Sequence, residues 1–78
     1  MAKTKQTPAM SLDALRQSRK VTQVEMAKRL EIGQGAVSRI EGRDDVKVST
    51  LRDYVAGLGG ALVLQAVFNG KAVTIHLD

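Results

Sequence analysis

The chain has 78 residues, a formal net charge of +4 and no cysteine. This length suits one small domain near the lower limit for a self-sufficient core. The lack of cysteine excludes disulfides, thiolate metal sites and a thiol nucleophile. No apolar run is long enough to span a bilayer, and the polar N-terminal residues lack the apolar core of a signal peptide. We therefore expect a cytoplasmic protein with no membrane partner.

The positive charge is concentrated near the N-terminus. Residues 1–20 carry five Lys or Arg side chains against Asp13 alone, so this segment accounts for the whole net charge of +4. Residues 1–10 predict a flexible basic arm, which either lies along DNA through Lys3 and Lys5 or is simply a solvated terminus. A basic end suits a polyanionic partner, although it also serves solubility.

A first helix is expected after the arm. Either Thr7 with Pro8, or Ser11, can start this helix, and it should end near residues 19–20, before the next helix begins. Its inward positions are Leu12 and Leu15.

Residues 22–41, TQVEMAKRLEIGQGAVSRIE, predict two short helices joined by a tight turn. Thr22 and Glu25 form a capping box at the start of the first of them. The inward positions of the two helices are Met26, Ala27, Leu30, Val37 and Ile40. The outward positions of the second helix are Gln34, Ser38 and Arg39. This arrangement is typical of a helix-turn-helix, whose second helix enters the DNA major groove; the alternative is an ordinary helical hairpin.

The same stretch resembles the Cro/C1-type (XRE) helix-turn-helix family. The residues that carry the resemblance are Thr22, Gln23, Ala27, Leu30, Ile32, Gln34, Ala36, Val37, Ser38, Arg39, Ile40 and Glu41. The resemblance implies a lambda-repressor-like domain of four helices over residues 11–60. It also implies a structural ion pair between Arg16 of the first helix and Glu41 at the end of the second helix of the motif.

Three residues depart from the family pattern. Glu31 stands at the turn position that usually holds glycine, where a positive φ costs a non-Gly residue on the order of 1 kcal/mol. Gly33 replaces the usual N-cap serine, at a cost of about a few tenths of a kcal/mol. Gly35 removes a side chain that often touches bases.

A fourth helix should follow the polar loop at residues 42–47. Ser49 is its expected cap, and Gly59 and Gly60 are expected to end it. Its apolar face consists of Leu51, Tyr54, Val55 and Leu58, with the Tyr54 hydroxyl at the edge of the core.

Residues 61–78 predict a β-hairpin. Asn69 and Gly70 between alternating apolar runs favour a type I′ turn, which places Phe68 opposite Lys71 and Leu64 opposite Ile75. One face is almost wholly apolar, and an isolated hairpin is marginal in water. It therefore either folds onto its own helices or packs against a second copy, and we favour the second. The expected dimer surface consists of Leu62, Leu64, Phe68, Val73, Ile75 and Leu77.

The segment STLRDYVAGLGGALVLQAVF at residues 49–68 is similar to the corresponding part of HigA-type and HipB-type antitoxins. The resemblance now extends over residues 11–77. It implies a homodimeric repressor that binds a palindromic operator in double-stranded DNA, represses its own operon and binds a cognate toxin. The alternatives are a stand-alone or prophage regulator without a toxin, and a protein-interaction module that does not bind DNA.

Within this interpretation the outward residues divide by what they contact. Gln34 suits adenine and Arg39 suits guanine, whereas Ser38 reaches either a base edge or a phosphate. The expected DNA-backbone contacts are Thr22, Gln23, Gly35, Arg43 and Lys47.

We expect no enzyme, cofactor or metal site. His76, the single histidine, lies on the last predicted strand, where no nucleophile or metal ligand accompanies it. Asp44 and Asp45 are better read as a solvated loop than as a metal site. No Gly-rich phosphate loop follows a strand.

Overall fold

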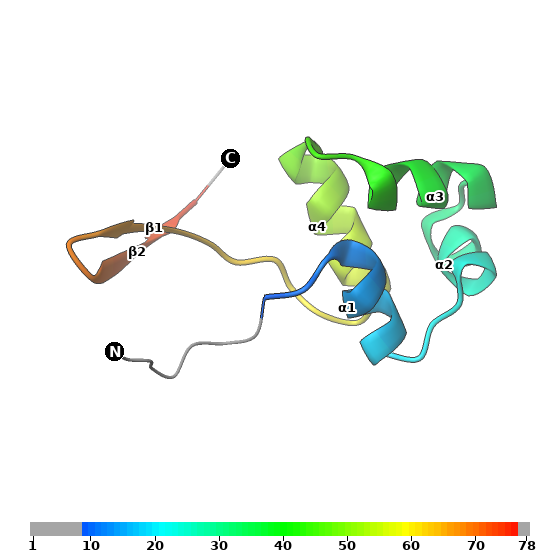
Figure 1. Ribbon diagram of the computed structural model, residues 1–78, viewed down its shortest axis with the longest axis horizontal. Coiled ribbons are helices and arrows are strands. Elements are labelled where there is room, and N and C mark those ends of the chain that lie inside the picture. The colour runs from blue at the N-terminus through cyan, green and yellow to red at the C-terminus, as the bar shows by residue number, and fades with distance from the viewer. Residues whose placement is uncertain (1–8, 77–78) are drawn as a thin grey trace.

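The computed structural model describes residues 9–76, which form four helices and a two-stranded hairpin (Figure 1). The helices are α1 (Leu12–Ser18), α2 (Gln23–Leu30), α3 (Gln34–Gly42) and α4 (Val48–Gly57), and the strands are β1 (Leu64–Phe68) and β2 (Lys71–Ile75). This order confirms the predicted fold class, which is mainly α with four helices followed by a C-terminal β-hairpin. None of the helices in this part of the chain is long and apolar enough to cross a membrane.

Side-chain caps fix where the first two helices begin. Ser11 is the N-cap of α1, and its hydroxyl accepts from the Ala14 N–H at 3.4 Å. The alternative start at residues 7–8 lies outside the described residues. The predicted capping box of α2 is confirmed, because Thr22 Oγ1 accepts from the Glu25 N–H at 3.0 Å and Glu25 Oε1 accepts from the Thr22 N–H at 2.8 Å.

The turn between α2 and α3 has the strain that its sequence predicts. Glu31 adopts a left-handed conformation with φ of 59° and ψ of 43°. Gly33 is the N-cap of α3 and makes no side-chain hydrogen bond there. This turn sets the direction of α3 relative to α2, and thereby the face that α3 shows to solvent.

The predicted cap of α4 was wrong. Lys47 is the N-cap rather than Ser49, which lies inside the first turn of the helix. The reason is that the Lys47 carbonyl already accepts the first helical bond, from the Leu51 N–H at 3.0 Å. At its other end α4 stops as expected, with Gly59 at a φ of 89°.

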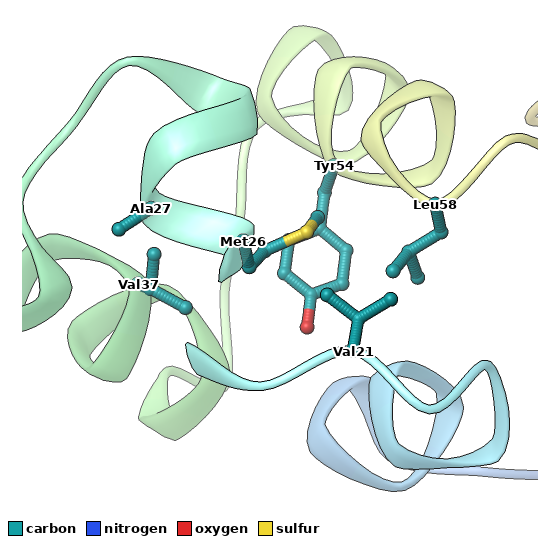
Figure 2. Close-up of a cluster of buried hydrophobic side chains, with 6 residues drawn as sticks. All are labelled: Val21, Met26, Ala27, Val37, Tyr54 and Leu58. Atoms are coloured by element: carbon teal, nitrogen blue, oxygen red, sulfur yellow. The ribbon is translucent and has the colours of Figure 1, made fainter. Parts of the chain in front are cut away.

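The core lies between the helices and is centred on Tyr54 (Figure 2). Its buried apolar residues are Val21, Met26, Ala27, Val37, Tyr54 and Leu58. Leu12, Leu15, Leu30 and Ile40 pack against this cluster. Tyr54 belongs to the core as expected and is 0% exposed. Its hydroxyl donates to Glu41 Oε2 at 2.6 Å, with the Leu12 carbonyl as a second acceptor at 3.1 Å, so it lies where the apolar cluster meets these polar groups.

The hairpin has the predicted register, with Phe68 opposite Lys71 and Leu64 opposite Ile75. Asn69 and Gly70 have φ values of 49° and 82°, as the type I′ turn requires. The hairpin stands apart from the four helices (Figure 1), and every residue of β2 is exposed. The alternative in which the hairpin folds onto its own helices is therefore not what this chain does.

Candidate nucleic-acid interface

One face of α3 is anchored in the core and the other is open to solvent. Val37 is fully buried, and Ala36 and Ile40 are half-buried beside it. The exposed residues along the rest of the helix include Gln34, Gly35, Ser38 and Arg39. A short helix held this way can offer polar side chains to a groove without losing its packing.

The N-terminal ends of α2 and α3 meet through their glutamines. Gln34 Nε2 donates to Gln23 Oε1 at 3.3 Å. Gln23 is half-buried, and its own Nε2 donates to Glu41 Oε1 at 3.1 Å. Thr22 lies next to it and is exposed, with its hydroxyl oxygen engaged in the cap. The structure thus brings Thr22, Gln23 and Gln34 together at one corner of the motif.

A buried ion pair holds this corner to the rest of the domain. Arg16 Nε donates to Glu41 Oε2 at 2.7 Å and Arg16 Nη2 donates to Glu41 Oε1 at 3.3 Å. The third nitrogen, Arg16 Nη1, donates to the Val21 carbonyl at 2.8 Å. Because Tyr54 also donates to Glu41, the carboxylate joins α1, α3 and α4 and contacts α2 through Gln23.

The surrounding groups keep this pair charged. Burial raises the pKa of Glu41, but hydrogen bonds from Arg16, Tyr54 and Gln23 outweigh it and hold the pKa below its usual value. The hydrogen bond to Glu41 raises the pKa of Arg16. Burial, followed by the hydrogen bond to Glu41, raises the pKa of Tyr54, so the phenol remains a donor. At neutral pH Glu41 is therefore an ionised carboxylate that accepts hydrogen bonds only.

Three basic side chains gather beside α3. Arg39, Arg43 and Lys47 are exposed and line a groove of about 420 Å³ between α3 and α4. Apolar side chains also line the groove, and so does one acid, Asp53. Gly35 lies next to the Arg39 side chain, since a Cβ on Gly35 would make an ordinary contact of 3.6 Å with Arg39 Nη1.

Several residues expected at functional sites lie elsewhere or outside the described chain. Lys3, Lys5 and Leu77 are outside residues 9–76. The remaining residues of the expected dimer surface are on the hairpin or just before it, away from α3: Leu62, Leu64, Phe68, Val73 and Ile75. No group of three potential metal ligands occurs among the described residues.

Sequence reasoning missed the link from Glu41 to Gln23, and with it the contact between the two glutamines. Each was assigned a separate role, one on the DNA backbone and one on a base. The signal that was available is their position: both are the first residue of a helix in the helix-turn-helix.

Comparison with known proteins finds relatives of this chain in both sequence and structure. No family model matches it. It is 38% identical, over 69 residues, to the protein named "Putative antitoxin HigA2" from Mycobacterium tuberculosis (strain ATCC 25618 / H37Rv), a match that spans 86% of this chain and 68% of that protein.

Two solved structures share both fold and sequence with it at 29% identity. One concerns induced DNA bending by unique dimerization of a HigA antitoxin, with a TM-score of 0.82 over 94% of this chain and 100% of that chain. The other is a DNA-bound antitoxin HigA3, with a TM-score of 0.81 over 92% of this chain and 96% of that chain. The agreement in sequence along most of both chains shows that this chain belongs to the HigA family of antitoxins.

Proposed function

We propose that the chain is a sequence-specific DNA-binding repressor that works as a homodimer. In its biological setting it is the antitoxin and autorepressor of a type II toxin–antitoxin operon. The observation that carries the proposal is the open face of α3, where Gln34, Ser38 and Arg39 are exposed on a helix anchored by Val37. The similarity to a DNA-bound HigA3 supports the same use of this face.

On this proposal Gln34 reads adenine and Arg39 reads guanine, each through a pair of hydrogen bonds in the major groove. Ser38 lies between them and contacts a phosphate or a base edge. Contacts to the DNA backbone come from both sides of the motif: Thr22, Gln23, Gly35, Arg43 and Lys47. The grouping of Arg43 and Lys47 beside α3 supports this, since phosphate contacts fix the register in which base contacts can form.

We propose the hairpin as the dimer surface. Phe68 is 66% exposed, Val73 53% and Ile75 42%, on a two-stranded sheet that its own helices leave uncovered. Pairing with a second copy covers this face and gives the two-fold symmetry of a palindromic operator. The similarity to a HigA antitoxin whose dimerization is linked to DNA bending supports a dimer.

The remaining parts of the proposal follow from family membership. A HigA antitoxin has a toxin partner, which favours the antitoxin setting over a stand-alone regulator. DNA binding is favoured over a pure protein-interaction module by the relative bound to DNA. We propose no catalytic role and place the protein in the cytoplasm, where a bacterial operon is transcribed.

The test is the binding of the purified protein to the DNA upstream of its own gene. Fluorescence anisotropy measures the affinity over a range of salt concentrations. We expect tight binding that weakens steeply with salt, because phosphate contacts release counterions. Arg43→Ala and Lys47→Ala should each weaken binding to specific and unrelated DNA alike and lower the salt slope by about one unit. Ser49→Ala, at an exposed position near the start of α4, is the control. Equal affinity for the upstream DNA and for unrelated DNA would refute sequence-specific repression.

A further inference from the structure

The turn of the hairpin holds the single asparagine of the chain, Asn69, followed by Gly70. Both residues are exposed, and the turn lies at the end of the hairpin that points away from the helices (Figure 1). A Cβ placed on Gly70 would meet nothing within 4 Å. Because Gly70 has no side chain and no neighbour crowds it, nothing hinders contact between its backbone nitrogen and the side chain of Asn69.

Asn-Gly is the dipeptide in which an asparagine side chain reacts most readily with its own backbone. The nitrogen of Gly70 attacks Cγ of Asn69 and forms a succinimide ring, and the N–H proton leaves with the side-chain NH2 group as ammonia. A water molecule then opens the ring at one of its two carbonyls. Attack at Cγ gives aspartate. Attack at the backbone carbonyl gives isoaspartate, in which the chain runs through Cγ and the α-carboxylate becomes the side group.

The reaction requires the hairpin to open. The intact turn holds Asn69 at a φ of 49° in a type I′ turn, and the ring closes only after the backbone rotates to bring the Gly70 nitrogen toward Cγ. Two paired strands are marginally stable alone, and every residue of β2 is exposed, so an uncovered hairpin opens readily. A second copy packed on the hairpin resists this opening. The unpaired chain should therefore react faster than the dimer.

The two products differ in the length of the backbone. Aspartate leaves the backbone unchanged, and Asp-Gly suits a type I′ turn as Asn-Gly does. Isoaspartate adds a carbon atom to the backbone between Phe68 and Lys71, which face each other across the turn. Loop length and turn type fix the register of a hairpin, so the longer connection no longer holds Leu64 opposite Ile75. The isoaspartate chain thereby loses the ordered apolar face of the hairpin.

We propose that Asn69 deamidates spontaneously in the unpaired chain and that the isoaspartate form can no longer dimerise. This inference rests on the proposed role of the hairpin as the dimer surface. It adds a modification site that needs only water as a reactant. A chain that stays unpaired is in this way lost from the pool that can form the operator-binding dimer.

The test is to age the purified protein in mildly alkaline buffer, which promotes loss of the Gly70 N–H proton. Mass spectrometry of the peptide that contains Asn69 follows the conversion of the amide to an acid. An isoaspartate O-methyltransferase with its methyl donor labels the isoaspartate fraction, and light scattering measures the dimer. The wild type should lose dimer in proportion to the isoaspartate that it gains. Leu64→Asp, which is expected to be monomeric, should be converted faster than the wild type at the same concentration.

Two variants at the turn separate the longer backbone from the loss of the amide. Asn69→Gly cannot form the ring, and Gly-Gly also suits a type I′ turn, so this variant should remain dimeric throughout the ageing. Asn69→Asp has the charge that deamidation adds but not the extra backbone atom, so a fresh sample should be as dimeric as the wild type. Prolonged treatment with the methyltransferase returns isoaspartate to aspartate through the same ring. This treatment should restore the dimer in the aged wild type.

The outcomes separate this inference from the dimer on which it rests. A fresh wild-type protein that is monomeric refutes the hairpin dimer and the inference together. A dimeric wild type whose Asn69 keeps its amide, or whose isoaspartate form remains dimeric, overturns the inference and leaves the dimer intact. A fresh Asn69→Asp protein that is monomeric also overturns it, because the added charge alone then prevents pairing. Conversion of Leu64→Asp no faster than that of the wild type contradicts reaction in the unpaired chain.

Discussion

Glu41 carries a full set of hydrogen bonds, and this explains why a charge can lie within so small a core. Four donors from Arg16, Tyr54 and Gln23 surround its two oxygens. A buried carboxylate without such partners would be destabilising, and a pair of opposite charges compensates only when its remaining lone pairs are also used. The sequence resemblance implied the Arg16 partner. It did not predict the other two, because Tyr54 and Gln23 reach Glu41 from helices that only the tertiary structure brings together.

Removal of Arg16 should therefore be costly. Arg16→Met keeps much of the side-chain volume but leaves Glu41 buried without its main partner, and it takes a donor from the Val21 carbonyl. We expect a loss of about 1–3 kcal/mol in the free energy of unfolding, measured by urea denaturation. Arg19→Met, at an exposed position one residue past α1, should change it by less than about 0.5 kcal/mol. Similar midpoints for the two variants would contradict the structural role of the pair.

Acid should remove the stabilisation that Glu41 provides. Its pKa is lower in the folded chain than the ordinary value of 4.5, so the contribution is complete above that pH. It is lost as the pH falls through the folded value, since protonation ends the ion pair. The pKa values of Asp13 and Glu25 are also lowered, chiefly by hydrogen bonds from Ser11 and from the Thr22 backbone. Unfolding of wild type and Glu41→Gln should be compared from pH 6 to pH 2, and the wild type should lose more stability.

If the two proteins lose stability in parallel over that range, Glu41 has the same pKa in both states and the ion pair contributes nothing to acid sensitivity. The comparison works because Asp13 and Glu25 are present in both proteins, so their titration cancels in the difference.

Periodicity in the sequence was sufficient to predict each helix, but not how the helices approach one another. The apolar stripes of α2 and α3 and the hairpin register were predicted correctly, because spacing of three and four residues or of two fixes which side chains share a face. The start of α4 was missed because a capping pattern locates a helix end only to within about two residues. The hydrogen bonds of the Tyr54 hydroxyl to Glu41 and to Leu12 were missed because they depend on contacts between elements. Gly57 is another such case: it lies where α4 crosses α2, and nothing in the local sequence marks it.

A larger side chain at Gly57 should separate α2 and α4. A Cβ there would lie 3.1 Å from Leu30 Cδ2 and 3.2 Å from Met26 Cε, and Arg29 Nη1 also donates to the Gly57 carbonyl at 2.9 Å. Gly57→Val should destabilise the fold by about 1–3 kcal/mol through overpacking. Gly42→Val is the matched control, since a Cβ at Gly42 meets nothing within 4 Å. Thermal denaturation of the two variants measures the difference, and a Gly57→Val protein as stable as Gly42→Val would argue against a close helix crossing.

The whole molecule consists of a packed helical unit and a hairpin that has no core of its own. The helical unit buries six apolar residues, whereas the hairpin and the residue before it leave five exposed: Val63, Val67, Phe68, Val73 and Ile75. An isolated two-stranded sheet is at best marginally stable in water, so the hairpin needs a partner that covers one of its faces. A second copy of the chain is the partner that we propose, and the apolar face containing Leu64 is the face that it should cover.

A charge on that face should prevent the dimer. Leu64 is half-buried on β1 opposite Ile75, and an aspartate there would lie unpaired between two apolar surfaces. We expect Leu64→Asp to be monomeric in light scattering, with the helical signal retained in circular dichroism because the hairpin lies outside the helical core. Gln65→Asp is the control, since Gln65 is exposed and its side chain points to the opposite face of the same strand. This variant should remain dimeric.

Two half-sites of a palindromic operator bind a dimer cooperatively, so Leu64→Asp should also lose most of its affinity for the full operator while keeping that for a single half-site. A folded dimer of Leu64→Asp would place the subunit contact on another surface.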